Sequence, residues 1–409
     1  MSPTMQQAQP IVSGRSVPRR HRVLPVACLL TLLAVLTPEL TLAPVVGGED
    51  ALGAPAPRDV APAVGLVRLL DEPAARHATR TERPAERQEA SASEFAAALE
   101  AARSSANAYG VTAAIVRDGR MVWSGAVGVR RDGVTRLQPD DTLVIGSVTK
   151  TFLAATILQL ASEHAISLDD PVTTYLPATT IGGEITIRQL LDHTSGLADV
   201  FNDTTRTALE QHPEQPWTSD QVMGALHAPW YDPGENWAYA NTNYLLLGLI
   251  IESVTGLSLH EALAERFLEP MALDDTALIS ATDADAVLSP AWATIFWGSG
   301  AMVSSAADLA TWGDALYRGD VLSAPMRAAM LRPNRNDYGL GVQRLQLAGV
   351  TGFGHTGLLN TYTTLLFHLP SEDVTIALLV NRSEVNLADM LAAHPPNGKS
   401  LLELVGAAS

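Results

Sequence analysis

The chain has 409 residues, 47% of them hydrophobic and only 17% charged, which is enough apolar material for a sizeable core. Acidic residues outnumber basic ones by 44 to 27, and the resulting formal charge of −17 argues against nucleic acid as a partner. The single cysteine excludes a disulfide framework and metal sites built on several thiolates.

The N-terminal segment has the composition of an export signal. Four arginines between residues 15 and 22 precede the apolar run VLPVACLLTLLAVL at 23–36, which at about fourteen residues is short for a membrane span. We expect residues 1–43 to be a signal peptide, or a membrane anchor where the segment is not cleaved. Cys28 lies inside the run and would leave with the signal. The expected location is the periplasm, the cell envelope or the medium.

Residues 44–90 are interpreted as a disordered linker. They are rich in Ala, Pro, Arg and Glu and poor in aromatic residues, a composition that buries too little apolar surface to pack. Removing residues 1–36 takes away four arginines and no acid, so the balance changes from 27 against 44 to 23 against 44, a formal charge of −21. The remainder, 91–409, is predicted to form one domain of catalytic size.

The domain is predicted to begin with a helix and a β-hairpin. Ser91 stands three residues before Glu94, the spacing of a capping box, ahead of an alanine-rich amphipathic pattern that runs toward Gly110. Two strand-like runs then flank the Asp-Gly dipeptide at 118–119, a short-range hairpin signal. A second Asp-Gly, at 132–133, is expected to end the second run.

Helical patterns dominate residues 143–319, interrupted by loops that contain proline or glycine. After about residue 336 the runs become short and strand-like, in VQRLQL, GFGHTG, TYTTLLFHL and VTIALLV, before a last helical stretch in SLLELVGAA. Strands at both ends thus bracket a mainly helical subdomain. We therefore predict an α+β fold, an antiparallel sheet with N- and C-terminal helices on one face and the helical subdomain on the other.

The stretch IGSVTKTF at 145–152 contains the first chemistry-bearing pair. Ser147 and Lys150 are three residues apart, so on a helix their side chains lie on one face, within reach of each other. Ser147 falls at the start of that helix, where free N–H groups and the macrodipole favour negative charge. A lysine whose pKa is lowered by burial can take the proton of a serine hydroxyl. Alone, the spacing is also that of a capping serine beside a solvated lysine.

Two other hydrolase signatures are absent from the sequence. No serine has glycine both two places before and two places after it, as a nucleophile elbow requires. His260 and Glu261 begin like the zinc motif H-E-x-x-H, but position 264 is alanine, so His260 is expected on a helix surface. We expect neither a metal nor an organic cofactor.

Three motifs in order give the pair its context. SVTK at 147–150 is followed by YAN at 239–241 and HTG at 355–357, and the further matches are LLDHTSGL at 190–197, PGE at 233–235, GAMVSSAADLATW at 300–312 and YGLGV at 338–342. With these motifs residues 91–390 resemble the serine β-lactamase and penicillin-binding protein superfamily. Within it they resemble the branch of class C β-lactamases and D-alanyl-D-alanine carboxypeptidases. The resemblance implies the β-lactamase/transpeptidase-like fold.

The resemblance also implies catalytic roles. Ser147 would be the acylated nucleophile and Lys150 its proton acceptor or relay. Tyr239 would pass the proton to the leaving group, in one form as a phenolate, which for a phenol of ordinary pKa near 10 needs a cationic neighbour. Asn241 would donate to the substrate amide carbonyl and help to orient Lys150. His193 and Ser195, in the HTSG stretch, are expected to be structural.

The HTG motif is implied to bind the substrate and its oxyanion. The N–H of Leu358, next after Thr356 and Gly357, would form the oxyanion hole with the N–H of Ser147, and Gly357 would allow the close approach. Many β-lactamases of this superfamily have lysine where His355 stands. Because a histidine is mostly neutral at pH 7, attraction of a substrate carboxylate is expected to be weaker here and to depend on pH.

We therefore expect an exported serine hydrolase that forms an acyl-enzyme at Ser147 and releases it with water. Its substrate is a D-alanyl peptide, as in peptidoglycan, a β-lactam or a small ester, three alternatives that the residues leave open. A penicillin-binding sensor or scaffold protein without turnover is the alternative from another class. Intact Ser147, Lys150, Tyr239 and Asn241 argue against it. We expect a monomer with no nucleic-acid partner and no membrane contact except through an uncleaved N-terminal segment.

Overall fold

The computed structural model describes residues 90–407, except 178–180, 182, 283–286 and 320. The predicted signal segment 1–43 and all but the last residue of the predicted linker 44–90 lie outside the described residues. The described chain enters directly into the helix expected at the start of the domain.

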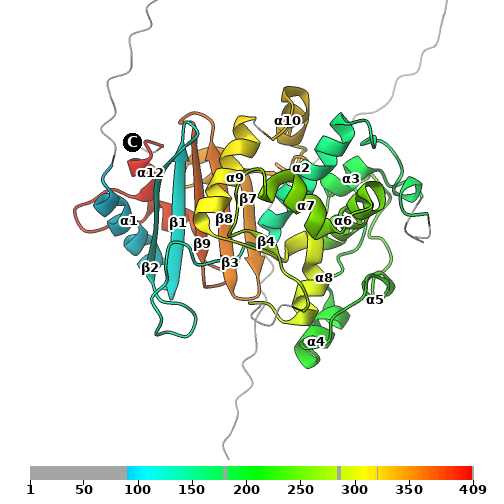
Figure 1. Ribbon diagram of the computed structural model, residues 1–409, viewed down its shortest axis with the longest axis horizontal. Helices are drawn as coiled ribbons and strands as arrows, with labels where there is room; N and C mark the ends of the chain where they lie inside the picture. The colour runs from blue at the N-terminus through cyan, green and yellow to red at the C-terminus, as the bar shows by residue number, and fades with distance from the viewer. Residues whose placement is uncertain (1–89, 178–180, 182, 283–286, 320, 408–409) are drawn as a thin grey trace, which may run out of the picture. The chain divides into compact units, whose positions relative to one another are not determined.

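A six-stranded sheet forms the centre of the domain (Figure 1). Its strands lie in the order β2-β1-β9-β8-β7-β6, and every neighbouring pair is antiparallel. The strands are β1 (Gly110–Arg117), β2 (Arg120–Gly128), β6 (Gln343–Leu347), β7 (Val350–Leu359), β8 (Tyr362–Leu369) and β9 (Val374–Val380). Pairing of β1 with β9 joins the N-terminal hairpin to the C-terminal strands, so the predicted antiparallel sheet is confirmed.

The central strands are apolar because helices cover the sheet on both faces. Every residue of β8 and β9 is buried, whereas the edge strand β6 alternates half-buried and exposed residues. The Asp-Gly dipeptide at 118–119 has positive φ at both positions, as a two-residue hairpin turn requires. The predicted strand end at 132–133 is wrong. β2 ends at Gly128, and Asp132 instead accepts from the N–H groups of Val134 and Thr135 within an irregular loop.

Three helices cover one face of the sheet: α1 (Ala92–Ser105), α11 (Leu387–Ala392) and α12 (Leu401–Leu404). The capping box predicted for α1 is present, since Glu94 N donates to Ser91 Oγ and Ser91 N donates to the Glu94 carboxylate. Phe95, Ile115 and Phe367 belong to the apolar cluster between these helices and the sheet. The short α11 was not expected from the sequence.

The other face is covered by α9 (Ala306–Arg318), which joins the sheet to the helical part (Figure 1). Trp312 of α9 is completely buried and stacks on Phe152 of α2 (Thr149–Ser162), with ring centroids 4.0 Å apart. Its indole N–H donates to Thr151 Oγ1 at 2.9 Å. The helix that follows Ser147 is therefore fastened to the layer that covers the sheet.

The helical part holds seven further α-helices among the described residues: α3 (Ile187–Leu191), α4 (Asp203–Gln211), α5 (Ser219–Gly224), α6 (Asn241–Thr255), α7 (Leu259–Leu263), α8 (Pro290–Gly300) and α10 (Ala324–Leu331). Single turns lie at Gly146–Val148, Val172–Thr174 and Ala264–Leu268. The predicted helical segment 143–319 also contains a small antiparallel sheet in the order β3-β5-β4, formed by Leu143–Val144, Met302–Ser304 and Ala277–Leu278.

Within the described ranges no single helix has the length and apolar composition needed to cross a membrane. Only the bent pair Asn241–Thr255 and Leu259–Leu268 reaches that length and composition, when its two members are counted together.

Removing the indole of Trp312 is expected to destabilise the whole domain. Trp312→Ala leaves a cavity between α2 and α9 and should lower the free energy of unfolding by about 3 to 5 kcal/mol in urea titrations. The exposed Trp230 offers the same substitution as a control. Trp230→Ala should stay within about 0.5 kcal/mol of the wild type, and equal effects of the two changes would contradict this account of the core.

Candidate active site

Ser147 lies in a short turn between the small sheet and a buried helix. β3 ends at Val144, the 3₁₀ turn Gly146–Val148 follows, and α2 begins at Thr149. Gly146 has a φ of +52°, and a Cβ at this position would lie 2.9 Å from the backbone nitrogen of Leu358. Because glycine takes this conformation without strain and leaves this space open, the turn can lie directly against β7.

Lys150 is completely buried and faces three oxygen atoms. Its Nζ lies 3.0 Å from Ser147 Oγ, 2.9 Å from Asn241 Oδ1 and 2.6 Å from the backbone oxygen of Ser299. The oxygens of Asn241 and Ser299 can only accept, so a neutral amine donates its two N–H groups to them. Its lone pair is then left for the Ser147 hydroxyl, which is what a general base requires.

The environment of Lys150 favours this neutral form. Burial lowers the pKa of Lys150 from its ordinary 10.5 to about 7, while the charge of Asp199 acts in the opposite direction. The lowering corresponds to roughly 5 kcal/mol in favour of the neutral amine. Ser299 follows the break in α8 at Trp297, and its backbone oxygen accepts from Lys150, which helps to hold a proton on the amine. The proton can therefore be both held and released near neutral pH.

Asn241 is the first residue of α6, and Asp199 sets the orientation of its side chain. The backbone N–H and the Nδ2 of Asn241 both donate to the Asp199 carboxylate, each at 3.2 Å. This leaves Oδ1 for Lys150, because a flipped amide would place oxygen against oxygen. Burial raises the pKa of Asp199, and the N–H of Phe201 and the charge of Lys150 offset part of that increase.

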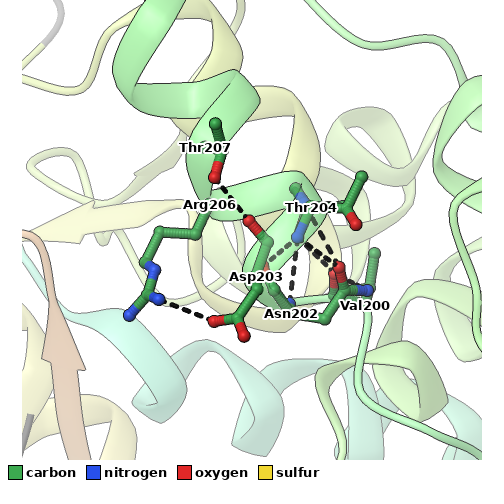
Figure 2. Close-up of polar contacts among 7 residues, drawn as sticks. Val200, Asn202, Asp203, Thr204, Arg206 and Thr207 are labelled. Atoms are coloured by element: carbon green, nitrogen blue, oxygen red, sulfur yellow. Dashed lines mark hydrogen bonds and ion pairs between the residues drawn. The ribbon is translucent and has the colours of Figure 1, made fainter.

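The loop that carries Asp199 is anchored by the N-terminus of α4 (Figure 2). Asn202 Oδ1 accepts from Thr204 N at 3.0 Å and from Thr205 N at 3.2 Å, a helix cap. The Thr205 hydroxyl donates to Val200 O at 2.6 Å, and Val200 N donates to Thr242 Oγ1 on α6 at 2.8 Å. The carboxylate is thus held on a loop that is tied to both α4 and α6.

Tyr239 stands beside Lys150 with its hydroxyl buried and without a hydrogen-bond partner in the described part of the chain. The Lys150 Nζ lies 4.9 Å from the centroid of the Tyr239 ring, over its face. Burial raises the pKa of Tyr239, and the neighbouring Ser147 hydroxyl offsets only part of the increase. The phenolate form that the resemblance allowed is therefore disfavoured, and Tyr239 is a neutral phenol that can donate a proton.

The HTG motif lies on β7, against the Ser147 turn. A Cβ on Gly357 would lie 2.0 Å from the backbone oxygen of Ile145, so β7 and the turn meet backbone to backbone. Thr356 is held from the other side, because its N–H and its hydroxyl both donate to Gln343 Oε1, at 3.0 and 3.2 Å. The closeness of Leu358 N to the turn is what the predicted oxyanion hole requires, and this role stays a prediction.

His355 differs from what the sequence suggested. It is buried, its Nδ1 lies 2.6 Å from Thr356 O, and its Nε2 lies 2.9 Å from the Tyr338 hydroxyl. Since a carbonyl can only accept, Nδ1 carries the hydrogen and Nε2 accepts from Tyr338. Burial, helped by the charge of Lys150, lowers the pKa of His355 to about 3. The expected pH-dependent attraction of a carboxylate is therefore wrong, because His355 stays neutral near pH 7.

His193 and Ser195 hold the YAN loop and the start of α6 in place through hydrogen bonds. His193 Nδ1 accepts from Ala240 N at 3.2 Å and from Asn243 Nδ2 at 3.0 Å, while the Ser195 hydroxyl donates to Asn243 Oδ1 at 2.7 Å. The His193 ring also packs on Tyr239, with centroids 4.3 Å apart. These contacts agree with the structural roles expected for both residues.

The structure brings the predicted site residues together from three distant segments of the chain, 147–150, 239–241 and 355–358. It adds two partners of Lys150 that sequence reasoning missed, the carboxylate of Asp199 and the carbonyl of Ser299. Asp199 follows the HTSGL stretch by two residues, and that proximity to a motif was the only available signal. A backbone carbonyl such as that of Ser299 has no signature in a sequence.

Comparison with known proteins places this arrangement in a family. A D-aminopeptidase of Cereibacter sphaeroides is 29% identical over 301 residues, which cover 66% of this chain and 56% of the relative. A penicillin-binding protein of Bacillus subtilis is 26% identical over 293 residues, 61% of this chain and 62% of the relative. The chain thus spans little more than half the length of these curated relatives.

Among solved structures, a D-stereospecific amidohydrolase from a Streptomyces species superimposes with a TM-score of 0.62 at 30% identity. The match covers 72% of this chain and 96% of that structure. This confirms the β-lactamase/transpeptidase-like fold. The Beta-lactamase family model matches residues 95–394, from the first helix past the last strand. With most of its length matched, this chain belongs to the beta-lactamase family of serine hydrolases.

Proposed function

We propose that this protein hydrolyses the amide bond that follows a D-amino acid residue, in D-amino-acid amides and in peptides that begin with a D residue and whose carboxylate lies far from that bond. The observation that carries the proposal is the buried Lys150 Nζ, whose two carbonyl partners leave its lone pair for Ser147. Such a pair acylates at neutral pH without a metal. The names of the relatives, D-aminopeptidase and D-stereospecific amidohydrolase, support this bond and this stereochemistry.

Acylation follows from the geometry of the site. Ser147 Oγ attacks the amide carbon while its proton passes to Lys150 Nζ, and the N–H groups of Ser147 and Leu358 stabilise the oxyanion. The carbon–nitrogen bond then breaks as Tyr239 gives its phenolic proton to the leaving nitrogen, and Lys150 returns the proton to Tyr239. The product amine leaves, and an ester joins the acyl group to Ser147. Water cleaves that ester with Lys150 and Tyr239 again exchanging the proton.

The neutral His355 bears on the choice of substrate. D-alanyl-D-alanine peptides and β-lactams carry a carboxylate close to the bond that is cleaved, whereas an amino-acid amide does not. His355 supplies no positive charge at the position where the resemblance implies carboxylate recognition. The proposal therefore favours amides over the carboxypeptidase, β-lactamase and esterase alternatives. A non-hydrolytic penicillin-binding sensor finds no support in the relatives named as hydrolases.

Ser147→Ala should abolish both labelling by a fluorophosphonate and turnover. We expect the wild type to hydrolyse D-alanine amide and D-phenylalanine amide at least about 100-fold faster, in kcat/KM, than their L enantiomers. Loss of the nucleophile should reduce that value by about 10⁴-fold or more. The exposed Ser253 provides the control, since Ser253→Ala removes a serine hydroxyl far from this chemistry.

The same assay should include a penicillin, a peptide ending in D-alanyl-D-alanine and a simple ester. Faster turnover of the carboxylate-bearing substrates than of the D-amides would overturn the substrate assignment but keep Ser147 as nucleophile. Labelling that persists in Ser147→Ala would remove the nucleophile assignment itself.

The rate should follow the protonation of Lys150. A base must be unprotonated to act, so kcat/KM for a D-amide is expected to rise with pH and level off above an apparent pKa of about 7. Below that pH it should fall about tenfold per pH unit. His355, with a pKa of about 3, should add no second transition between pH 5 and 9. This fall in kcat/KM toward low pH is called the acid limb of the profile. An acid limb centred near pH 10 would show that Lys150 is not desolvated as described.

Asp199→Asn should change this profile in a defined direction. The charge of Asp199 raises the pKa of Lys150, so its removal is expected to move the acid limb to lower pH. The looser Asn241 amide should also lower the plateau of kcat/KM about tenfold or more. Asp308→Asn is the control, because Asp308 is a carboxylate bonded to Asp275 N and the Thr276 hydroxyl, outside the site. An acid limb that stays in place, or moves upward, would contradict the role of Asp199.

A further inference from the structure

A cavity of about 170 Å³ lies between α5, α6 and α8, and no step of the proposed reaction uses it. Its apolar lining consists of Trp217, Val222, Met223, Leu245, Leu249 and Trp297. Ser219 also lines the cavity and is exposed, whereas Val222 and Leu245 are buried. The cavity therefore runs from the surface at the start of α5 into the interior.

The size and chemistry of the cavity define the group that fits. An engineered apolar cavity of about 150 Å³ in another protein holds one benzene molecule, so about one aromatic ring or a short acyl chain fits here. The hydroxyl of Thr294 also lines the cavity, but it donates to Pro290 O and accepts from Trp217 N, both at 2.8 Å. Two indoles and four aliphatic side chains remain, which favour a flat neutral ring and disfavour a charged group.

The walls of the cavity are the two helices that supply the carbonyl partners of Lys150. Asn241, Leu245 and Leu249 are spaced by four residues on α6, so the cavity continues along the face of the helix that begins with Asn241. Trp297 precedes Ser299 by two residues on α8. Both hydrogen-bond acceptors of Lys150 are thus carried by elements that touch the cavity.

Trp297 lines the cavity and lies two residues before Ser299, so it connects the cavity with an acceptor of Lys150. The backbone at Trp297 leaves the helical conformation and interrupts α8 just before Ser299. Its ring lies flush on α6 at Gly248, where a Cβ would come within 2.8 Å of it. Any group that moves this indole, or spreads α6 from α8, changes the distance between the Asn241 and Ser299 oxygens.

We propose that this cavity binds a small neutral aromatic or short acyl group and that its occupancy alters the hydrogen bonds of Lys150. Neither Ser147 nor Lys150 belongs to the lining of the cavity. The inference does not depend on the proposed substrate. It requires only that Ser147 reacts with the help of Lys150, so that the rate of this reaction reports whether the cavity is occupied.

Benzyl alcohol is a suitable probe, since its ring fits the cavity and its hydroxyl can reach the solvent near Ser219. Binding to the full chain is measured by ligand-observed NMR, which requires no chemistry. Coupling is measured as the pH dependence of the rate at which a fluorophosphonate labels Ser147. We expect saturable binding, and a shift of the acid limb by about 0.3 pH unit or more, a twofold change in the proton equilibrium.

Leu249→Trp fills the cavity and should weaken binding at least about tenfold while shifting the acid limb by itself. Leu257→Trp is the matched control, because Leu257 is also half-buried but lies outside the cavity lining. It should leave both binding and the acid limb unchanged. Unfolding midpoints of both variants verify that they fold.

Several results would overturn the proposal. They are the absence of saturable binding to the wild type, equal binding to Leu249→Trp, and binding that leaves the acid limb in place. An effect of benzyl alcohol that disappears at saturating fluorophosphonate would place the probe at the reacting site instead. A protein that binds benzyl alcohol but does not label contradicts the acylation at Ser147 and leaves the cavity assignment standing.

Discussion

The desolvated amine of Lys150 is the constraint on which the rest of the site depends. A lysine removed from water is stable only where its protons find oxygen acceptors, and here two of these come from opposite walls, α6 and α8. Burial lowers the pKa of this amine to about 7, and neither direct acceptor is an ionised side chain that would raise it again. The same burial that costs stability lowers the pKa of the amine into the range that a general base needs near neutral pH.

Much of the surrounding structure holds these acceptors in place. Asp199 orients the Asn241 amide, the capped end of α4 holds the loop that carries Asp199, and His193 fixes the backbone next to Asn241. Trp312 ties α2 to α9 and so to the sheet. Helix caps, side-chain hydrogen bonds and ring stacking thus hold in place the groups that surround one buried nitrogen.

The N-terminal hairpin, the first helix and the antiparallel type of the sheet followed from local patterns, because alternation, the Asp-Gly turn at 118–119 and the capping box of Ser91 act over a few residues. The strand order, in which β1 pairs with β9, was not predicted. The nucleophile and its base followed from motifs. A single sequence could not reveal the tertiary contacts on which two features of the site depend. The neutrality of His355 depends on Tyr338 and on burial, and the Ser299 carbonyl has no side chain to recognise. The prediction of a strand end at 132–133 was wrong because Asp132 forms local hydrogen bonds within a loop instead.

Gly357 lets β7 of the sheet lie against the Ile145 carbonyl of the helical layer, and the residues that flank this contact, Ile145 and Leu359, share one apolar cluster. Ser147, Lys150 and Asn241 all belong to the helical layer, while Leu358 belongs to the sheet. A chain whose layers have separated can therefore keep its nucleophile and base together yet lack one of the predicted oxyanion donors. The proposed acylation therefore needs the helical layer and the sheet in contact, and neither layer supplies the complete site alone.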